Sequence, residues 1–165
     1  MSDFDAGPAS RLVVSAAVLD HLERPTALLC AARSYPPEHA GQFELPGGKV
    51  EPAERPVQAL ARELDEEIGL RARLGSELLP PAGLAVPAPL GGGPGDDAPA
   101  WPVMHGYRMR VWLAEPTRVG DRGRAGAAHE RLEWVSLDPP SQVRQLPWLP
   151  ADLPIIEALV TVLGR

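Results

Sequence analysis

Three glutamates that lie close together in the sequence could form a metal site. Glu63, Glu66 and Glu67 are three and four residues apart, so an α-helix would place their carboxylates on one face. Like charges at this spacing repel one another and weaken the helix. A bound cation would remove the repulsion, and ligand sets made only of oxygen suit hard ions such as Mg2+ or Mn2+. The spacing therefore predicts a divalent-metal site on this helix face.

The residues around these acids predict a helix from about residue 55 to residue 68. Pro56 suits the first turn, where the missing N–H has no helical partner, and Gly69 suits a helix end. The turn Leu45–Gly48 before the helix would let backbone come close to a ligand. A stripe of apolar residues at helical spacing, on the side away from the acids, is expected to be buried: Val57, Leu60, Ala61, Leu64 and Ile68.

The whole stretch Gly48–Leu70 resembles the Nudix box, G-x5-E-x7-R-E-U-x-E-E-x-G-U, in which U is a bulky aliphatic residue. A salt-bridged surface helix is the alternative interpretation, but a match of this length is a specific signal. The resemblance implies an α/β fold, namely a Nudix α/β/α sandwich in which a curved mixed β-sheet lies between helices. Every fixed position of the box is filled: Gly48, Glu54, Arg62, Glu63, Leu64, Glu66, Glu67, Gly69 and Leu70.

The resemblance also implies a role for each of these residues. The metal ligands would be the carbonyl of Gly47 and the carboxylates of Glu63, Glu66 and Glu67, with Mg2+ as the expected cofactor and Mn2+ as the alternative. Arg62 would orient a neighbouring box glutamate through a bidentate hydrogen bond. The remaining residues would shape the loop and the helix ends: Gly48, Glu54 and Gly69.

Two carboxylates are candidates for the general base that takes a proton from the attacking water. One is Glu63 in the box. The other is Glu130, which lies in the segment His129–Trp134 and resembles the acid of an H-E-x-x-x-W segment in MutT-like members of the family. A solvated loop acid is the alternative interpretation of Glu130.

Three more residues are expected to bind substrate. Arg33 ends a strand where MutT-like proteins often hold an arginine against phosphates, and an exposed arginine is the alternative. Lys49 could reach a phosphate or pair with a box glutamate. Asp152 lies where MutT-like proteins read the edge of the base, and an N-cap of the last helix is the alternative. An ionised carboxylate only accepts hydrogen bonds, so it would favour bases with an amino group, such as cytosine.

The remaining chain predicts further elements around the box. Residues 11–19 and 26–32 are apolar and are expected to form a hairpin of buried strands. The Pro/Gly-rich segment 80–102 is expected to be a solvated, mobile insertion, and a lid over the substrate is the alternative. Other strands are expected at 43–45, 71–79, 105–114 and 133–137, and a second helix at 152–163.

Length and charge narrow the class of protein. The 165 residues suit a single domain, and the net charge of −6 argues against wide surfaces for nucleic acid or membrane. The single cysteine, Cys30, lies in an apolar run and is expected to be a buried, inert thiol. The acidic N-terminal residues 1–10 lack the apolar region of a signal peptide and are expected to be flexible. These features predict a cytoplasmic protein, monomeric or homodimeric, whose partner is a small-molecule nucleotide.

The expected activity is that of a metal-dependent Nudix pyrophosphohydrolase of the MutT-like type. It would cleave a (d)NTP, with cytidine or oxidised purine triphosphates as candidates, to the (d)NMP and pyrophosphate. The alternative substrates are ADP-ribose, a nucleotide sugar, a dinucleoside polyphosphate or coenzyme A. A non-catalytic Nudix sensor module is a further alternative, although such modules usually lose box glutamates and none is missing here.

Overall fold

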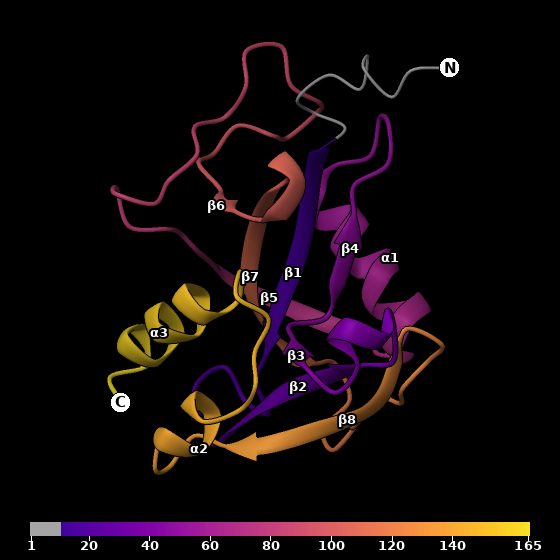
Figure 1. The fold of residues 1–165 in the computed structure, drawn as a ribbon, viewed down its shortest axis with the longest axis vertical. Helices are drawn as coiled ribbons and strands as arrows, with labels where there is room; N and C mark the ends of the chain where they lie inside the picture. Colours follow the sequence, from indigo (N-terminus) through magenta and orange to yellow (C-terminus); the bar gives the residue numbers. More distant parts are fainter. Residues whose placement is uncertain (1–10) are drawn as a thin grey trace.

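Two long neighbouring strands run parallel at the centre of the computed structural model, which describes residues 11–165 (Figure 1). They are β1 (Leu12–Val18) and β7 (Arg108–Pro116). The short β4 (Gly47–Lys49) adds to β1 in the antiparallel sense. Two strands pair antiparallel with β7, β5 (Ala72–Leu78) and β6 (Trp101–Pro102). The expected flexible segment 1–10 lies outside the described residues.

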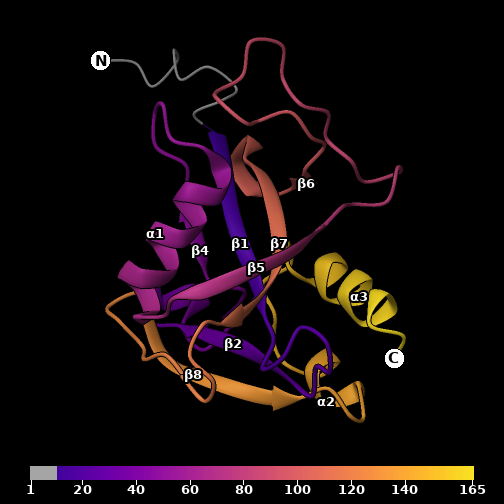
Figure 2. The same ribbon diagram turned by 180° about the vertical axis from the view of Figure 1, so that it is seen from behind.

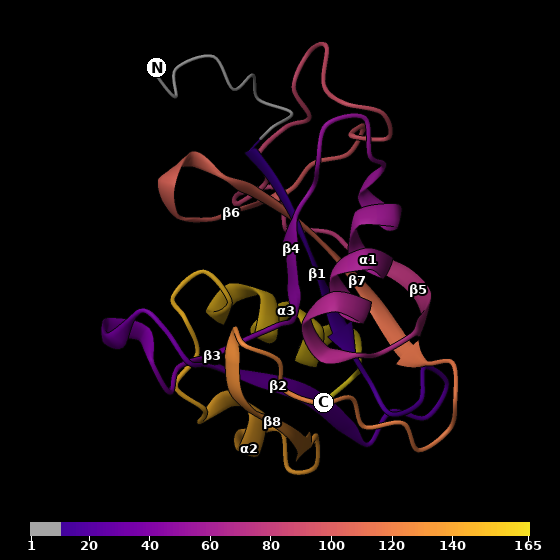
Figure 3. The same cartoon turned by 90° about the vertical axis from the view of Figure 1, so that its right-hand side faces the viewer.

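A second sheet crosses below β1 and β4 in the view of Figure 3. Its central strand is β2 (Ala27–Arg33), which pairs antiparallel with β3 (Phe43–Glu44) and β8 (His129–Ser136). The expected hairpin between the first two strands is therefore wrong. β1 and β2 meet only at an isolated bridge between Leu19 and Leu28 and then separate into different sheets. Both strands are apolar on both faces, so their composition predicts burial but not which strand lies beside which.

Two helices cover opposite sides of the strands (Figures 1 and 2). α1 (Pro56–Ile68) packs over one apolar cluster with β1 and β7, and α3 (Leu153–Val162) packs over the other. A short helix, α2 (Ser141–Arg144), was not expected, and 3-10 turns form at Pro37–His39 and Met104–Gly106. The mixed arrangement confirms the predicted α/β class. No helix within residues 11–165 has the length and apolarity to cross a membrane.

The buried side of α1 differs from the predicted stripe. Val57 and Ala61 are exposed, whereas Pro56 and Ala59 are buried together with three of the expected residues, Leu60, Leu64 and Ile68. The residues that face the sheet follow the i, i+4 line from Pro56 to Ile68, and Val57 and Ala61 lie to one side of it. The helix ends as expected, because Gly69 adopts the left-handed conformation with φ of 59°.

The Pro/Gly-rich segment between β5 and β6 packs against the sheet at its C-terminal end. Asp96 is 7% exposed and forms an ion pair of 2.8 Å with Arg108 of β7. Arg110 of the same strand donates to a backbone carbonyl of the segment at 2.7 Å. Trp101 is buried, and its Nε1 donates to the last carbonyl of β5 at 2.9 Å. The expectation of a solvated insertion without a core role is therefore wrong for this end, because β7 presents two arginines that bind it.

Candidate active site

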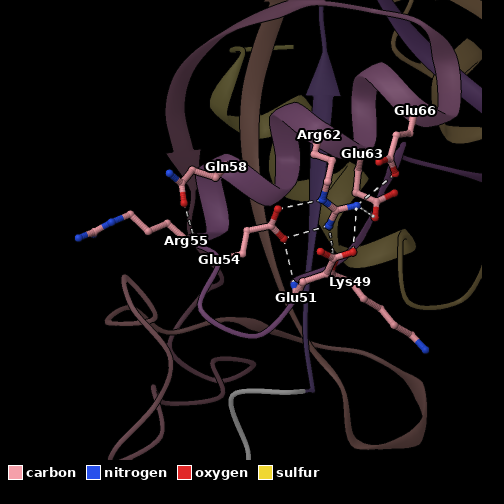
Figure 4. Close-up of polar contacts among 8 residues, drawn as sticks. All are labelled: Lys49, Glu51, Glu54, Arg55, Gln58, Arg62, Glu63 and Glu66. Atoms are coloured by element: carbon pink, nitrogen blue, oxygen red, sulfur yellow. Dashed lines mark hydrogen bonds and ion pairs between the residues drawn. The ribbon is translucent and has the colours of Figure 1, made fainter.

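Arg62 holds the acids of the box together (Figure 4). Its Nε and Nη2 donate to the two carboxylate oxygens of Glu54 at 2.8 and 3.0 Å. Its Nη1 donates to Glu63 at 2.8 Å and to Glu66 at 3.2 Å. Its Nη2 also donates to the backbone carbonyl of Lys49 at 3.0 Å. One guanidinium therefore links the loop before α1 to two of the three carboxylates that are predicted to bind metal.

Glu54 is the acid that Arg62 holds most fully. The hydrogen bonds from Arg62 hold the pKa of Glu54 below its usual range. Glu54 also accepts the backbone N–H of Glu51 at 3.0 Å, which closes the loop in front of the helix. The carboxylate thus ties the box loop to α1, the structural position that the resemblance implied.

Two adjacent glycines of β4 are required for different reasons. A Cβ at Gly47 would lie 1.9 Å from the backbone carbonyl oxygen of Val14 in the neighbouring strand. A Cβ at Gly48 would lie 2.3 Å from the carboxyl carbon of Glu63. Gly47 therefore allows β4 to pair with β1, and Gly48 leaves the space that the Glu63 carboxylate occupies.

Glu67 is half-buried near this turn. Its pKa is raised to about 7, mainly by burial and also by the like charges of Glu63 and Glu44, although His129 and a hydrogen bond from the Gly47 N–H lower it. That N–H lies 3.4 Å from the Glu67 carboxylate. A carboxylate that is buried among like charges is in a setting that a cation would stabilise.

The donors fit a hard divalent cation in their chemistry, because all are oxygen atoms and three are carboxylates. Gly48 supplies the space for one of them. Their positions are not yet those of a closed site. Within residues 11–165 no group of three His, Cys, Asp or Glu side chains converges closely enough to hold an ion. Glu63 and Glu66 instead share the guanidinium of Arg62.

A cavity of about 220 Å³ lies beside the β3–β4 turn. Three charged side chains line it, Glu44 of β3, Lys49 of β4 and Asp152 before α3, and most of the other lining residues are apolar. Mixed apolar walls with a few polar groups are typical of small-molecule sites. The cavity is lined by Val13, Glu44, Lys49, Val103, Met104, Tyr107, Met109, Leu149, Ala151 and Asp152.

Asp152 precedes α3 but makes no side-chain hydrogen bond to that helix. Its carboxylate accepts the N–H of Leu45 at 2.9 Å, and the residue is 5% exposed. Asp152 therefore occupies the N-cap position of α3, as the alternative expected, but its side chain does not cap the helix. Burial raises the pKa of Asp152 to about 7, with a smaller increase from Glu44, while the Leu45 N–H and Arg33 lower it. A pKa in this range adds a protonated form that can donate a hydrogen bond near neutral pH, which the expectation of an acceptor did not include.

Lys49 lines the cavity, whereas Arg33 is not among its lining residues. Arg33 is held by Glu44, to which its Nη1 donates at 2.9 and 3.0 Å, so it is not a free surface arginine. Lys49 points away from the box acids (Figure 4), and its ammonium lies 5.2 Å from the centre of the Tyr107 ring. Lys49 is therefore part of the cavity wall and does not pair with a box glutamate in this arrangement.

Glu130 is exposed and lies in β8 next to His129, the residue paired with Arg33. Its carboxylate pairs with Arg131 at 2.6 Å, and 41% of its side chain is exposed. The neighbouring His129 is fully buried instead and contacts Glu44. The structure therefore brings the box acids and Asp152 to opposite sides of one turn and places Glu130 on the surface.

Sequence reasoning missed three residues that line or adjoin the site. Glu44 lies just before the box turn, His129 lies just before Glu130, and Tyr107 lies at the start of β7. The signal that could have found Glu44 is its charge inside a short apolar strand, since an acid there needs a partner. The other two carry no signal of this kind in the sequence.

A family model described as NUDIX domain matches residues 9–159 of this chain. The chain belongs to the NUDIX family. The predicted resemblance is confirmed, and with it an enzyme of the MutT-like type that hydrolyses pyrophosphate bonds.

Two curated relatives cover most of the Nudix chain. A Mycobacterium tuberculosis protein named "Putative 8-oxo-dGTP diphosphatase 2" is 36% identical over 145 residues, covering 87% of this chain and 83% of the relative. The Escherichia coli K12 protein named CTP pyrophosphohydrolase is 32% identical over 145 residues, covering 86% of this chain and 87% of the relative. The solution structure of the E. coli ORF135 protein is similar with a TM-score of 0.64 and 28% identity, over 93% of this chain and 90% of that chain.

Proposed function

We propose that this Nudix enzyme is a metal-dependent pyrophosphohydrolase that converts a nucleoside triphosphate and water to the monophosphate and pyrophosphate. The observation that carries the proposal is the position of the cavity. The buried carboxyl of Asp152 lines it, and so does Lys49, which ends the strand of the box turn and so joins the cavity to the box. A nucleoside in the cavity would have its base at Asp152 and its phosphates towards the acidic face of α1.

Gly47, Glu63, Glu66 and Glu67 would hold the cation. When bound, Mg2+ or Mn2+ would offset the charge of the phosphates and lower the pKa of a water molecule. Arg62 keeps two of these carboxylates on one side of the helix through charge-assisted hydrogen bonds.

Glu63 is the better placed of the two candidates for the general base. It lies on the box face, and only 15% of its side chain is exposed. Glu130 is paired with Arg131 on the surface. We therefore assign the proton transfer to Glu63, with Glu63→Gln expected to lose far more turnover than Glu130→Gln.

The protonation of Asp152 bears on the choice of base. In its ionised form the carboxylate accepts a hydrogen bond, as from the amino group of cytosine, and in its neutral form it can also donate to a carbonyl of an oxidised guanine. The names of the two relatives, which specify CTP and 8-oxo-dGTP, support a choice between these same two bases.

A substrate panel tests the proposal. Pyrophosphate or phosphate release would be measured with Mg2+ for CTP, dCTP, dGTP, 8-oxo-dGTP and dATP, and for ADP-ribose, a nucleotide sugar, a dinucleoside polyphosphate and coenzyme A. We expect a triphosphate of cytidine or oxidised guanine to have the highest kcat/KM. A higher value for any compound that is not a triphosphate would contradict the proposal.

Variants of Asp152 test whether it reads the base. Asp152→Ala should lower kcat/KM for the best substrate. The corresponding loss of transition-state stabilisation should be roughly 1–3 kcal/mol, the scale of one specific contact to a base edge. Asp152→Asn should change the order of the substrates, because one acceptor becomes a donor. Asp65→Asn, on an exposed position of α1, is the matched control and should leave the order unchanged. An unchanged order in all variants would exclude base reading by Asp152.

A further inference from the structure

A cluster of charged and polar groups lies between the cavity and the acidic face of α1, and its members come from three strands. Arg33 ends β2, Glu44 lies in β3 and His129 begins β8. The register places Arg33 opposite His129 on one side of β2, while β3 pairs on the other side. Glu44 accepts from Arg33 Nη1 at 2.9 and 3.0 Å and lies 3.0 Å from His129 Nε2. One carboxylate is therefore held by two side chains.

The imidazole of His129 has Glu44 as its polar partner. The side chain is fully buried, and within the described residues its Nδ1 makes no hydrogen bond. Because ionised Glu44 offers only acceptor atoms, we assign the ring hydrogen to Nε2, which then donates to Glu44. A buried donor with this geometry fixes the position of the carboxylate that it contacts.

Two of the three guanidinium nitrogens of Arg33 donate hydrogen bonds. Its Nε donates to the carbonyl of Tyr35 at 3.0 Å, and its Nη1 donates to Glu44. In the part of the chain that the structure describes, Nη2 has no hydrogen-bond partner, and 24% of the side chain is exposed. The guanidinium is planar, so the two held nitrogens determine where Nη2 points.

Glu44 is also close enough to influence both halves of the site. It lines the cavity together with Asp152, and its charge raises the pKa of Asp152 and that of Glu67 on α1. A displaced Glu44 would therefore alter the orientation of Arg33 beside the cavity.

We propose that His129 is a positioning residue, which holds Glu44 so that Glu44 keeps the guanidinium of Arg33 oriented towards a phosphate of the substrate. This inference rests on the proposed function, because it requires a substrate that carries a phosphate. It adds His129 and Glu44 to the residues that determine substrate binding, without a chemical step of their own.

The test is a comparison of two substitutions at His129 in the full chain. The amide of Gln can place an N–H near the position of Nε2, whereas Asn is too short to reach Glu44. We expect His129→Asn to raise KM for the best substrate of the panel about tenfold, the scale of one hydrogen bond to a charged group, with kcat changed less than about threefold. His129→Gln should restore most of the KM. A wild-type KM in folded His129→Asn would overturn the proposal.

A double-mutant cycle shows whether His129 acts through Arg33. With Arg33→Ala already present, His129→Asn should raise KM no further, because the group that it orients is gone. Independent, additive effects would overturn the proposal. His39→Asn is the matched control, since His39 contacts Gln42 at 2.7 Å and has no bond to Glu44 or Arg33. Its KM should equal that of the wild type.

Two further measurements keep the outcome unambiguous. Thermal unfolding of each variant separates a fall in stability from a change in KM. If His129→Asn does not fold, Glu44→Gln takes its place, and a wild-type KM in that variant would overturn the proposal equally.

If the panel favours a compound that is not a nucleoside triphosphate, the proposed function fails. The same double-mutant cycle on that compound then decides separately whether His129 positions Arg33.

Discussion

The half-buried carboxyl of Glu67 and the buried carboxyl of Asp152 lie on opposite sides of the turn between β3 and β4. Burial raises the pKa of each to about 7. The turn divides its backbone donors between them, since the N–H of Leu45 lies 2.9 Å from Asp152 and that of Gly47 lies 3.4 Å from Glu67. The chain bends at Pro46, between the two donors, so one short segment can serve two sites.

The surroundings of the two carboxyls differ. Glu67 lies near the like charge of Glu63 on the same helix, and Asp152 lines a mostly apolar cavity. A carboxylate among like charges is suited to a cation, whereas a carboxyl in an apolar cavity is suited to a hydrogen-bonding group of a ligand. Similar pKa values therefore indicate different chemistry, and four measurements test this distinction.

The largest expected effect concerns Asp96, a third buried carboxylate, whose partner is an arginine. Asp96→Ala would leave the buried charge of Arg108 without its ion pair, so we expect the free energy of unfolding to fall by about 3 kcal/mol or more. Urea unfolding measures the change. Asp97→Ala is the matched control: its side chain is 84% exposed, and the loss should stay below about 0.5 kcal/mol. Equal, small losses would mean that the segment does not pack as the structure shows.

Glu67→Gln should separate the two carboxyls by their effect on turnover. We expect kcat to fall at least about 100-fold with saturating Mg2+, because one ligand of the proposed metal site loses its charge. The melting temperature should not fall, since an amide is less costly to bury than a charge. Asp152→Asn should keep kcat within about tenfold of the wild type. Near-normal turnover in Glu67→Gln would remove its catalytic assignment.

Gly48→Ala tests whether the turn positions the acidic face. The new Cβ would lie 2.3 Å from the carboxyl carbon of Glu63, a flexible group that can move, so we expect a folded protein with kcat lowered about tenfold. Gly47→Ala is the contrasting variant, because its Cβ would meet backbone at 1.9 Å and the fold itself should be lost. Circular dichroism and steady-state kinetics distinguish the two results. Full activity in Gly48→Ala would show that Glu63 does not need its observed position.

The sequence predicted those parts of the site that depend on local spacing. α1 begins at Pro56 and ends at Gly69 as expected, and Arg62 reaches Glu54 and Glu63 because residues of one helix and its leading loop are close by construction. The contacts within the box therefore follow from the local spacing of its residues. The predicted metal site itself stays a prediction.

The sequence could not predict features that depend on which strands meet. β1 and β2 are consecutive and apolar but belong to different sheets. The contact of Glu44 with His129 joins residues 85 positions apart and follows from the register of β2 with both of its neighbours. The same holds for Asp96, whose burial depends on an arginine of β7. Burial also changed the expected chemistry of Asp152, which the residue type alone assigned to an acceptor.

The pH dependence of stability measures the carboxyl of Asp152 directly. Its pKa in the folded protein is raised from 3.8 to about 7, so between these values the folded protein binds more protons than the unfolded chain. Its contribution to stability is therefore fully present below about pH 4 and is lost as the pH rises towards 7, by at most about 1.4 kcal/mol per pH unit. Asp152→Asn lacks the titrating group, so its free energy of unfolding should fall less over this range.

Urea unfolding without added metal, from about pH 4 to pH 8, compares these proteins. Asp20→Asn is the control of opposite sign. Hydrogen bonds from Thr26 and the adjoining backbone lower the pKa of Asp20 despite partial burial, so its contribution is present above about pH 4 and is lost only as the pH falls further. The free energy of unfolding of Asp20→Asn should therefore change with pH as that of the wild type does between about pH 5 and pH 8. If Asp152→Asn also follows the wild type there, Asp152 is ionised throughout, and the cavity then contains an acceptor that favours the amino group of cytosine over a carbonyl of oxidised guanine.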